Sequence, residues 1–141
     1  MVLQQYLTDP LFKRLYHIGF IGIAMISVGY MARFQVGSSH GWLGLFLDTF
    51  PNLFGSFGTP FLLLVLYTTW RKDLSLLRST RLFLLASLVS LVIFVLIELG
   101  HILLSLSFWD NNDMAASLLG GLLALVVWAG AVRTDTVDRK L

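Results

Sequence analysis

The side chains best placed to do chemistry are a glutamate and a histidine inside a strongly apolar stretch. Glu98 and His101 are three positions apart within residues 82–106, and Glu98 is the only glutamate in the sequence. A carboxylate that faces lipid costs roughly 3 kcal/mol even on the mildest insertion scales. We therefore expect Glu98 to face other protein or a wet cavity, with His101 available as a hydrogen-bond donor or proton carrier.

The polar residues of this stretch share one helical face. They are separated by 3, 8, 3 and 4 positions, in the order Ser87, Ser90, Glu98, His101 and Ser105, with Phe94 in the longest gap. Such separations place side chains on one side of an α-helix. This serine stripe predicts a helix face that contacts protein.

Charged residues from two other segments are expected to reach the same place. Arg33 ends a run of glycines, and Asp113 begins a run of small residues; the two runs are Gly19, Gly22 and Gly29, and Ala116, Gly120 and Ala124. Stripes of small residues let helices approach closely in membranes. We expect a polar pocket near the extracytoplasmic surface, where Arg33 opposes Glu98 and an aspartate. Plainer roles remain open, with Arg33 snorkelling to lipid phosphates and the aspartates capping the last helix.

A metal centre is not expected. Glu98 and His101 match the Glu-x-x-His pair of di-iron bundles, but such a site needs two of these pairs and two further carboxylates. A single-metal site of Glu98, His101 and Asp113 lacks a recognisable second shell. Nucleophilic catalysis by Ser105 or Ser117, with His101 as the base, is not supported by a recognisable nucleophile-elbow motif. The sequence also contains no phosphate-binding loop and no dinucleotide-binding fingerprint. We predict no metal and no cofactor.

Four apolar segments must position these residues. They lie at about 15–32, 51–70, 82–106 and 114–132, and crossing a bilayer takes about 20 residues of helix. The sequence is 57% hydrophobic and 13% charged, whereas soluble domains average about 25% charged residues. We predict an all-α fold: an integral membrane four-helix bundle with short loops, forming a single domain over residues 1–141.

The connection over residues 34–50 is predicted to be the longest loop. Its second half alternates glycine with large apolar side chains, which predicts a loop that lies in the membrane interface or dips back toward the bundle. Pro51 is expected in the first turn of the second span, with Thr49 as a candidate cap. Pro60, in the middle of that span, is expected to kink it.

The basic residues indicate an orientation. Nine of them lie before the first span, between the second and third, or after the fourth, whereas Arg33 is alone on the other side. The positive-inside rule therefore predicts that both termini are cytoplasmic. Because these residues are spread over three short segments and form no patch, we expect no nucleic-acid partner.

Residues 97–128 resemble the C-terminal half of VanZ-like membrane proteins. Glu98 matches the family's glutamate, Asp110 and Asp113 match the aspartates of its extracytoplasmic turn, and Gly120 and Gly121 match its glycine run. His101 replaces the usual glutamine, Ser117 replaces the usual asparagine, and the arginine often found before the turn is missing. The resemblance implies a small protein of the bacterial inner membrane. The predicted ligand-binding set is then Arg33, Glu98, His101, Asp110, Asp113 and Ser117.

Three functions fit these features. The first is binding of an amphiphilic cell-envelope ligand, a lipid or a glycopeptide, in the outer pocket. The second is a structural role in a larger membrane complex, in which Glu98 pairs with a partner subunit. The third is a lipid-modifying enzyme that uses Glu98 and His101 as acid and base. In the second case the serine stripe should face outward, and in the other two it should face the chain's own bundle.

Overall fold

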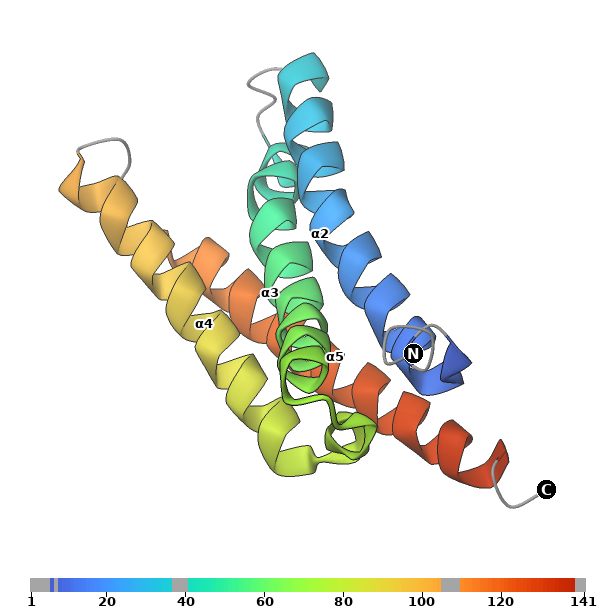
Figure 1. The fold of residues 1–141 in the computed structure, drawn as a ribbon. Coiled ribbons are helices and arrows are strands. Elements are labelled where there is room, and N and C mark those ends of the chain that lie inside the picture. The colour runs from blue at the N-terminus through green and yellow to red at the C-terminus, as the bar shows by residue number, and fades with distance from the viewer. Residues whose placement is uncertain (1–5, 7, 37–40, 105–109, 139–141) are drawn as a thin grey trace.

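The computed structural model describes residues 6, 8–36, 41–104 and 110–138. Within these ranges the chain forms four long α-helices and one short 3-10 helix, η1, and contains no strand. In chain order they are α2 (Pro10–Val36), α3 (Trp42–Arg71), η1 (Leu74–Arg78), α4 (Thr80–Leu103) and α5 (Asn111–Asp138) (Figure 1). All four α-helices are long and apolar enough to cross a membrane. The predicted all-α, four-helix membrane fold is confirmed.

The helices α2 and α4 begin earlier in the sequence than the predicted spans at about residues 15 and 82. α2 starts at Pro10, where the Asp9 side chain accepts the Phe12 N–H at 2.9 Å. α4 starts at Thr80, where the Ser79 hydroxyl accepts the Leu82 N–H at 3.4 Å. Such side-chain caps satisfy backbone donors that have no partner within the helix.

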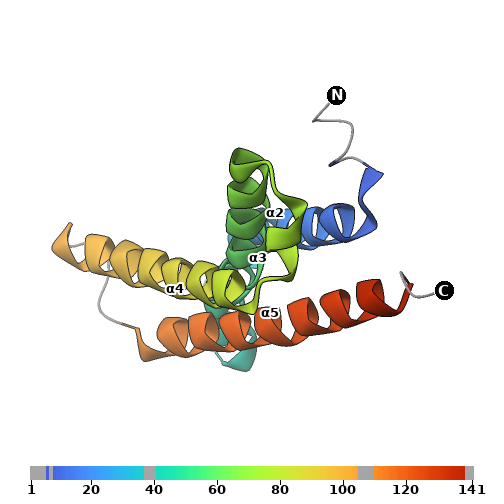
Figure 2. The same ribbon diagram turned by 60° about the horizontal axis from the view of Figure 1, so that its bottom comes forward.

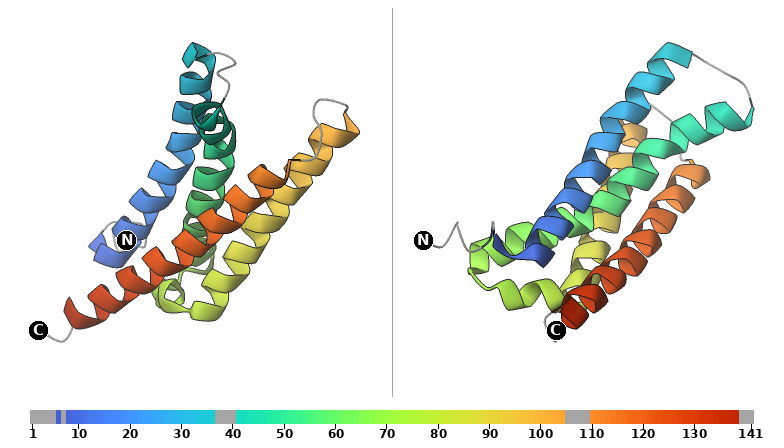
Figure 3. Two further views of the ribbon diagram at one scale, coloured as in Figure 1. Left: turned by 180° about the vertical axis from the view of Figure 1, so that it is seen from behind. Right: turned by 90° about the vertical axis from the view of Figure 1, so that its right-hand side faces the viewer.

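The largest difference from the sequence prediction is the start of α3. Residues 42–50 were predicted to be loop, but they form the first turns of this helix, so Pro51 lies well inside it. Thr49 caps nothing, because its hydroxyl donates to the Leu45 carbonyl oxygen one turn earlier, at 3.0 Å. Pro51 and Pro60 each remove one backbone hydrogen bond, and α3 is visibly curved in the right-hand view of Figure 3.

Glycines bring α3 into close contact with its neighbours. A Cβ built on Gly22 of α2 would lie 2.6 Å from the Cα of Gly58 in α3. A Cβ on Gly120 of α5 would lie 2.2 Å from the Leu53 carbonyl oxygen of α3. Both predicted stripes of small residues therefore lie at helix crossings, and α3 is the helix that they contact.

An aromatic core closes one end of the bundle. Phe83 of α4 lies flat against Trp128 of α5, with ring centroids 4.9 Å apart and an interplanar angle of 11°, and Phe61 of α3 packs on Phe83 at 5.2 Å. The Trp128 indole N–H donates to the Leu77 carbonyl oxygen of η1 at 3.1 Å. This contact fixes η1 beneath the core, at the end where α2 begins and α5 ends (Figures 1 and 2).

The two helix pairs separate toward the other end. α2 packs along α3, and α4 runs beside α5, but the far ends of α2 and α4 diverge (Figures 1 and 3). Large apolar side chains cover the outside of all four helices; Phe20, Leu66, Leu96 and Val126, one from each helix, are 58%, 65%, 60% and 71% exposed. Such a surface is suited to lipid contact and unsuited to water.

Candidate functional site

The serine stripe of α4 faces the chain's own bundle. Ser87 is 6% exposed, Ser90 is 1% exposed and Glu98 is 7% exposed, whereas residues on the other faces, such as Leu88 and Leu96, are largely exposed. Phe94, in the gap of the stripe, would be 2.4 Å from a Cβ on Gly55 of α3. The prediction that this face contacts protein is confirmed. Ser105 and the side chain of His101 lie outside the described residues.

Glu98 lies where α4 and α5 meet. Its Oε1 accepts the backbone N–H of Asp110 at 3.4 Å, across the turn that joins the two helices. The same aspartate begins α5, because its Oδ1 accepts the Asn112 N–H at 2.7 Å. The predicted capping role of Asp110 is thereby confirmed. The positive end of the α5 dipole further favours a carboxylate at this position.

Asp113 and Ser117 lie on consecutive turns of α5. Asp113, in the first turn, is half-buried, and Ser117 is 1% exposed. Ser117 shares the buried face of α5 with Gly120, which contacts α3. The structure thus places Glu98, Asp110, Asp113 and Ser117 toward one end of the α4–α5 pair.

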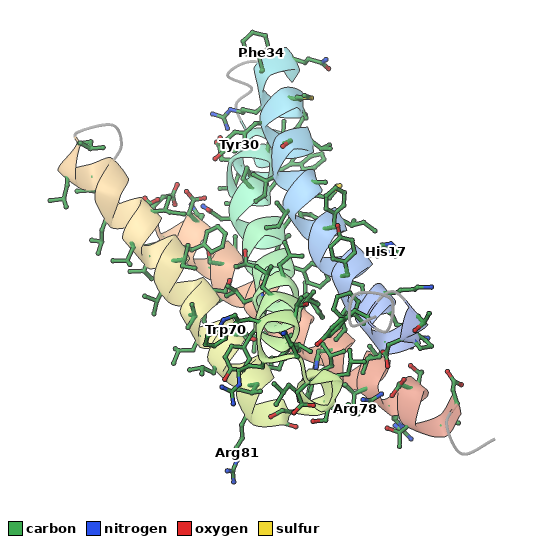
Figure 4. All side chains as sticks on the ribbon, in the orientation of Figure 1. His17, Tyr30, Phe34, Trp70, Arg78 and Arg81 are labelled. Carbon is green, nitrogen blue, oxygen red and sulfur yellow. The ribbon has the colours of Figure 1, made fainter. Side chains whose placement is uncertain are left out.

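Arg33 does not meet Glu98 as expected. It forms an ion pair with Asp48 of α3, and its Nη1 donates to the Gly44 carbonyl oxygen at 3.5 Å. Both side chains of the pair are well exposed, at 39% for Arg33 and 45% for Asp48. The Arg33 end of α2 belongs to the α2–α3 pair, which diverges from α4 at this end of the bundle (Figures 1 and 4). Arg33 is therefore removed from the site at Glu98.

The ion pairs Arg33–Asp48 and Arg78–Asp135 were not predicted from the sequence. Asp48 was not considered as a partner of Arg33 because its segment was predicted to be a loop. The spacing of Gly44, Leu47 and Pro51, which form one buried helix face, is the signal that could have revealed the helix. Asp135 lies beyond the fourth predicted span, which ends at about residue 132. It is 5% exposed, and its Oδ2 accepts Nε and Nη2 of Arg78 at 2.9 and 2.5 Å. Trp128, Ala131 and Asp135 follow one helical face, which is the signal that could have revealed it.

The polar side chains at the α4–α5 end can accept hydrogen bonds. Glu98, Asp110 and Asp113 offer carboxylate oxygens, and Ser117 offers a hydroxyl. Among the described residues, no three His, Asp or Glu side chains form a group that could hold a metal ion.

Comparison of the chain with protein-family models, with curated proteins and with solved structures yields no match. The resemblance to VanZ-like proteins therefore stays a prediction.

Proposed function

We propose that the protein is a VanZ-like protein of the bacterial inner membrane that binds an amphiphilic envelope ligand, a lipid or a glycopeptide, near Glu98. Both termini would be cytoplasmic and the ligand's polar group would enter from the opposite side. The orientation of Glu98 is the observation that best supports ligand binding. This carboxylate belongs to a membrane-spanning helix, yet it is 7% exposed and lies on the face directed at the chain's own bundle.

Moving an ionised carboxylate out of water into a membrane costs free energy. An ionised side chain inside a membrane protein is retained where it has a polar partner or a function. The Asp110 N–H contributes one partner, at 3.4 Å. A neutral Gln at position 98 would cost less to bury than a carboxylate, so we attribute the glutamate to recognition of a polar group.

The ligand's chemistry follows from the acceptors at this end. Carboxylates accept hydrogen bonds and attract cations, so the polar group should be a donor, such as an ammonium or a hydroxyl group. Apolar side chains of α4 surround this position on the outside, with Leu96 60% exposed and Ile97 45% exposed. An amphiphile could therefore keep its chain in lipid while its polar group reaches Glu98.

The inward direction of the serine stripe also bears on the alternative of a structural subunit. That role was expected to present Glu98 on the outer surface, to be paired by another protein. Glu98 is instead among the buried residues of α4, with Leu99 on the exposed side of the helix. No observation in the described part of the chain favours the subunit role over ligand binding.

The test compares lipids retained by the wild type and by Glu98→Gln after purification in mild detergent, measured by native mass spectrometry. Phosphatidylethanolamine, which carries an ammonium group, and phosphatidylcholine, whose ammonium has no N–H donor, would then be added back. We expect the wild type to prefer phosphatidylethanolamine and Glu98→Gln to lose that preference.

Asp135→Asn is the matched control, because it neutralises another buried carboxylate at the opposite end of the bundle. It should lower stability and leave the lipid preference intact. Equal retention of both lipids by the wild type and by Glu98→Gln would refute the proposal. A preference that Asp135→Asn abolishes as well would also count against it, because the effect would then reflect general unfolding.

A further inference from the structure

A second candidate ligand site lies on the outside of the bundle, between α3 and α4, at the end that η1 closes. It is a groove of about 440 Å³, and its walls are Leu63, Leu66, Tyr67 and Trp70 of α3 and Leu82 and Leu85 of α4. This volume falls within the ~300–1,000 Å³ typical of small-ligand sites. The groove therefore offers a purely apolar or aromatic lining on a helix surface that contacts lipid.

Two aromatic side chains mark the depth of the groove. Trp70 and Tyr67 lie one turn apart on α3, with ring centroids 5.9 Å apart, and Trp70 is 73% exposed. Trp and Tyr rings prefer the boundary between hydrocarbon and headgroups. The lower end of the groove is thus expected at headgroup level, and its leucine-lined part within the hydrocarbon.

Cations flank the groove at that same level. Arg71 directly follows Trp70, Lys72 is the next residue, and Arg81 precedes Leu82; all three are exposed. Figure 4 shows Arg81 projecting from the first turn of α4 beyond the end of the bundle, with Trp70 farther from that end. Asp73 is the one acidic residue within residues 71–81, which hold four basic residues; Arg78 pairs with Asp135, and the other three remain beside the groove.

Lys72 occupies a backbone position that does not favour it. It ends α3 in the left-handed conformation, with φ of 58° and ψ of 35°, where glycine is the usual residue. A lysine there gives up backbone stability relative to glycine and places a charge next to Arg71. The charge complements the negative end of the α3 dipole and adds to the positive charge at this end of the groove.

We propose that this groove binds one acyl chain of an anionic phospholipid, whose headgroup phosphate meets Arg71, Lys72 and Arg81. The apolar lining selects the chain, the aromatic pair sets the depth, and the cations select the negative headgroup. Each basic side chain near a headgroup favours anionic lipid by about five-fold in affinity. The site is separate from Glu98, which lies toward the opposite end of α4.

The experiment uses the fluorescence of Trp70 in reconstituted protein. Vesicles of phosphatidylcholine would contain either phosphatidylglycerol or further phosphatidylcholine with brominated acyl chains, which quench nearby tryptophan. The Trp70 signal is the difference between the wild type and Trp70→Phe. We expect brominated phosphatidylglycerol to quench it several-fold more effectively, and this preference to weaken at high salt.

Charge-removing variants test the headgroup contact. Arg71→Gln combined with Arg81→Gln should abolish most of the preference for phosphatidylglycerol. Lys13→Gln combined with Arg133→Gln is the matched control, because it removes the same charge from exposed positions on α2 and α5 near the same end. The control should keep the preference. Equal loss in both double variants would overturn the proposal, since it would reduce the effect to net charge.

Two further variants test the groove itself. Val89 is part of the groove wall, so Val89→Phe would fill the groove and should reduce quenching by brominated phosphatidylglycerol. Val92→Phe, at an exposed position outside the groove, should not reduce it.

Lys72→Gly tests the charge at the end of α3. It should raise the unfolding midpoint in pure phosphatidylcholine and lower the phosphatidylglycerol preference. Equal quenching by both brominated lipids in the wild type, or a groove covered by a second copy of the chain, would overturn the proposal.

Discussion

Gly22 of α2 and Gly58 of α3 cross backbone against backbone. A Cβ on Gly22 would lie 2.6 Å from the Gly58 Cα, and a Cβ on Gly58 would lie 2.8 Å from the Gly19 carbonyl oxygen. Neither obstruction is a flexible side chain that could move away. The pairing of α2 with α3 therefore depends on the absence of side chains at this crossing.

Gly22→Ala is expected to lower the free energy of unfolding by about 1–3 kcal/mol, because the two helices must separate to admit the methyl group. Gly130→Ala is the matched control, since a Cβ there would meet nothing within 4 Å. That control should be neutral or stabilising by up to about 1 kcal/mol, as expected for Gly→Ala on an open helix face. Reversible unfolding in mixed micelles would measure both, and equal effects of the two variants would contradict the crossing.

Removing Arg78 should strongly destabilise the protein. Arg78→Gln leaves the Asp135 carboxylate buried without its cation, which we expect to cost about 2–4 kcal/mol, somewhat less than a fully buried pair because the Arg78 side chain is 27% exposed. The measurement is a double-mutant cycle of Arg78→Gln and Asp135→Asn, with exposed Asp138→Asn as the control. A coupling energy indistinguishable from zero would show that the pair does not hold η1 to α5.

The exposed Arg33–Asp48 pair should contribute little. Its members are 39% and 45% exposed, so Arg33→Gln is expected to change the free energy of unfolding by less than about 1 kcal/mol. Because Arg33 pairs with Asp48, the effects of Arg33→Met and Glu98→Gln should add within about 0.5 kcal/mol. Thermal or chemical unfolding of the two single variants and the double variant would decide this. A larger coupling would restore the Arg33–Glu98 pocket that the sequence suggested.

Asp73 should titrate below an ordinary aspartate. The Ser75 hydroxyl and the Ser75 backbone N–H both donate to Asp73 and lower its pKa, with a smaller contribution from Arg71, against a weak opposing effect of burial. Because the folded pKa lies below the unfolded value, the stabilisation is present above pH 3.8 and is lost as pH falls through the folded pKa. Ser75→Ala should raise the pKa of Asp73, which NMR of the carboxyl carbon would detect. An unchanged titration would show that the hydroxyl does not bind the carboxylate.

The membrane spans and the inward-facing sides of the helices were predictable because a bilayer determines how long and how apolar a crossing helix must be. Length and hydropathy identify spans, and the cost of Ser87, Ser90 and Glu98 in lipid identifies the inner face of α4. The glycine stripe of α2 was equally predictable, since its members are three and seven residues apart, which places them on the one helix face that packs against α3. These features depend only on one helix and its solvent, so no knowledge of the other helices was required.

Features that depend on two helices were not predictable in the same way. Arg33 could have met any carboxylate at its end of the bundle, and the extension of α3 back to Trp42 brought Asp48 within reach. The glycines of residues 34–50 suggested a loop and Pro51 suggested the start of a helix, yet Gly44 and Pro51 are both buried within α3, where tertiary packing outweighs local preference. The inward orientation of Glu98 was therefore predictable, whereas the partner of Arg33 is Asp48 and not Glu98.

The aromatic core has a consequence for the order of assembly. Phe61 and Phe83 belong to helices synthesised early, but Trp128, which lies flat on Phe83, and Asp135, which holds Arg78, belong to α5. A ribosome makes α2, α3 and α4 before the residues that complete their core exist. The contacts of η1 with α2, α3 and α4 can form first, and insertion of α5 then completes the aromatic core and adds the Arg78–Asp135 ion pair.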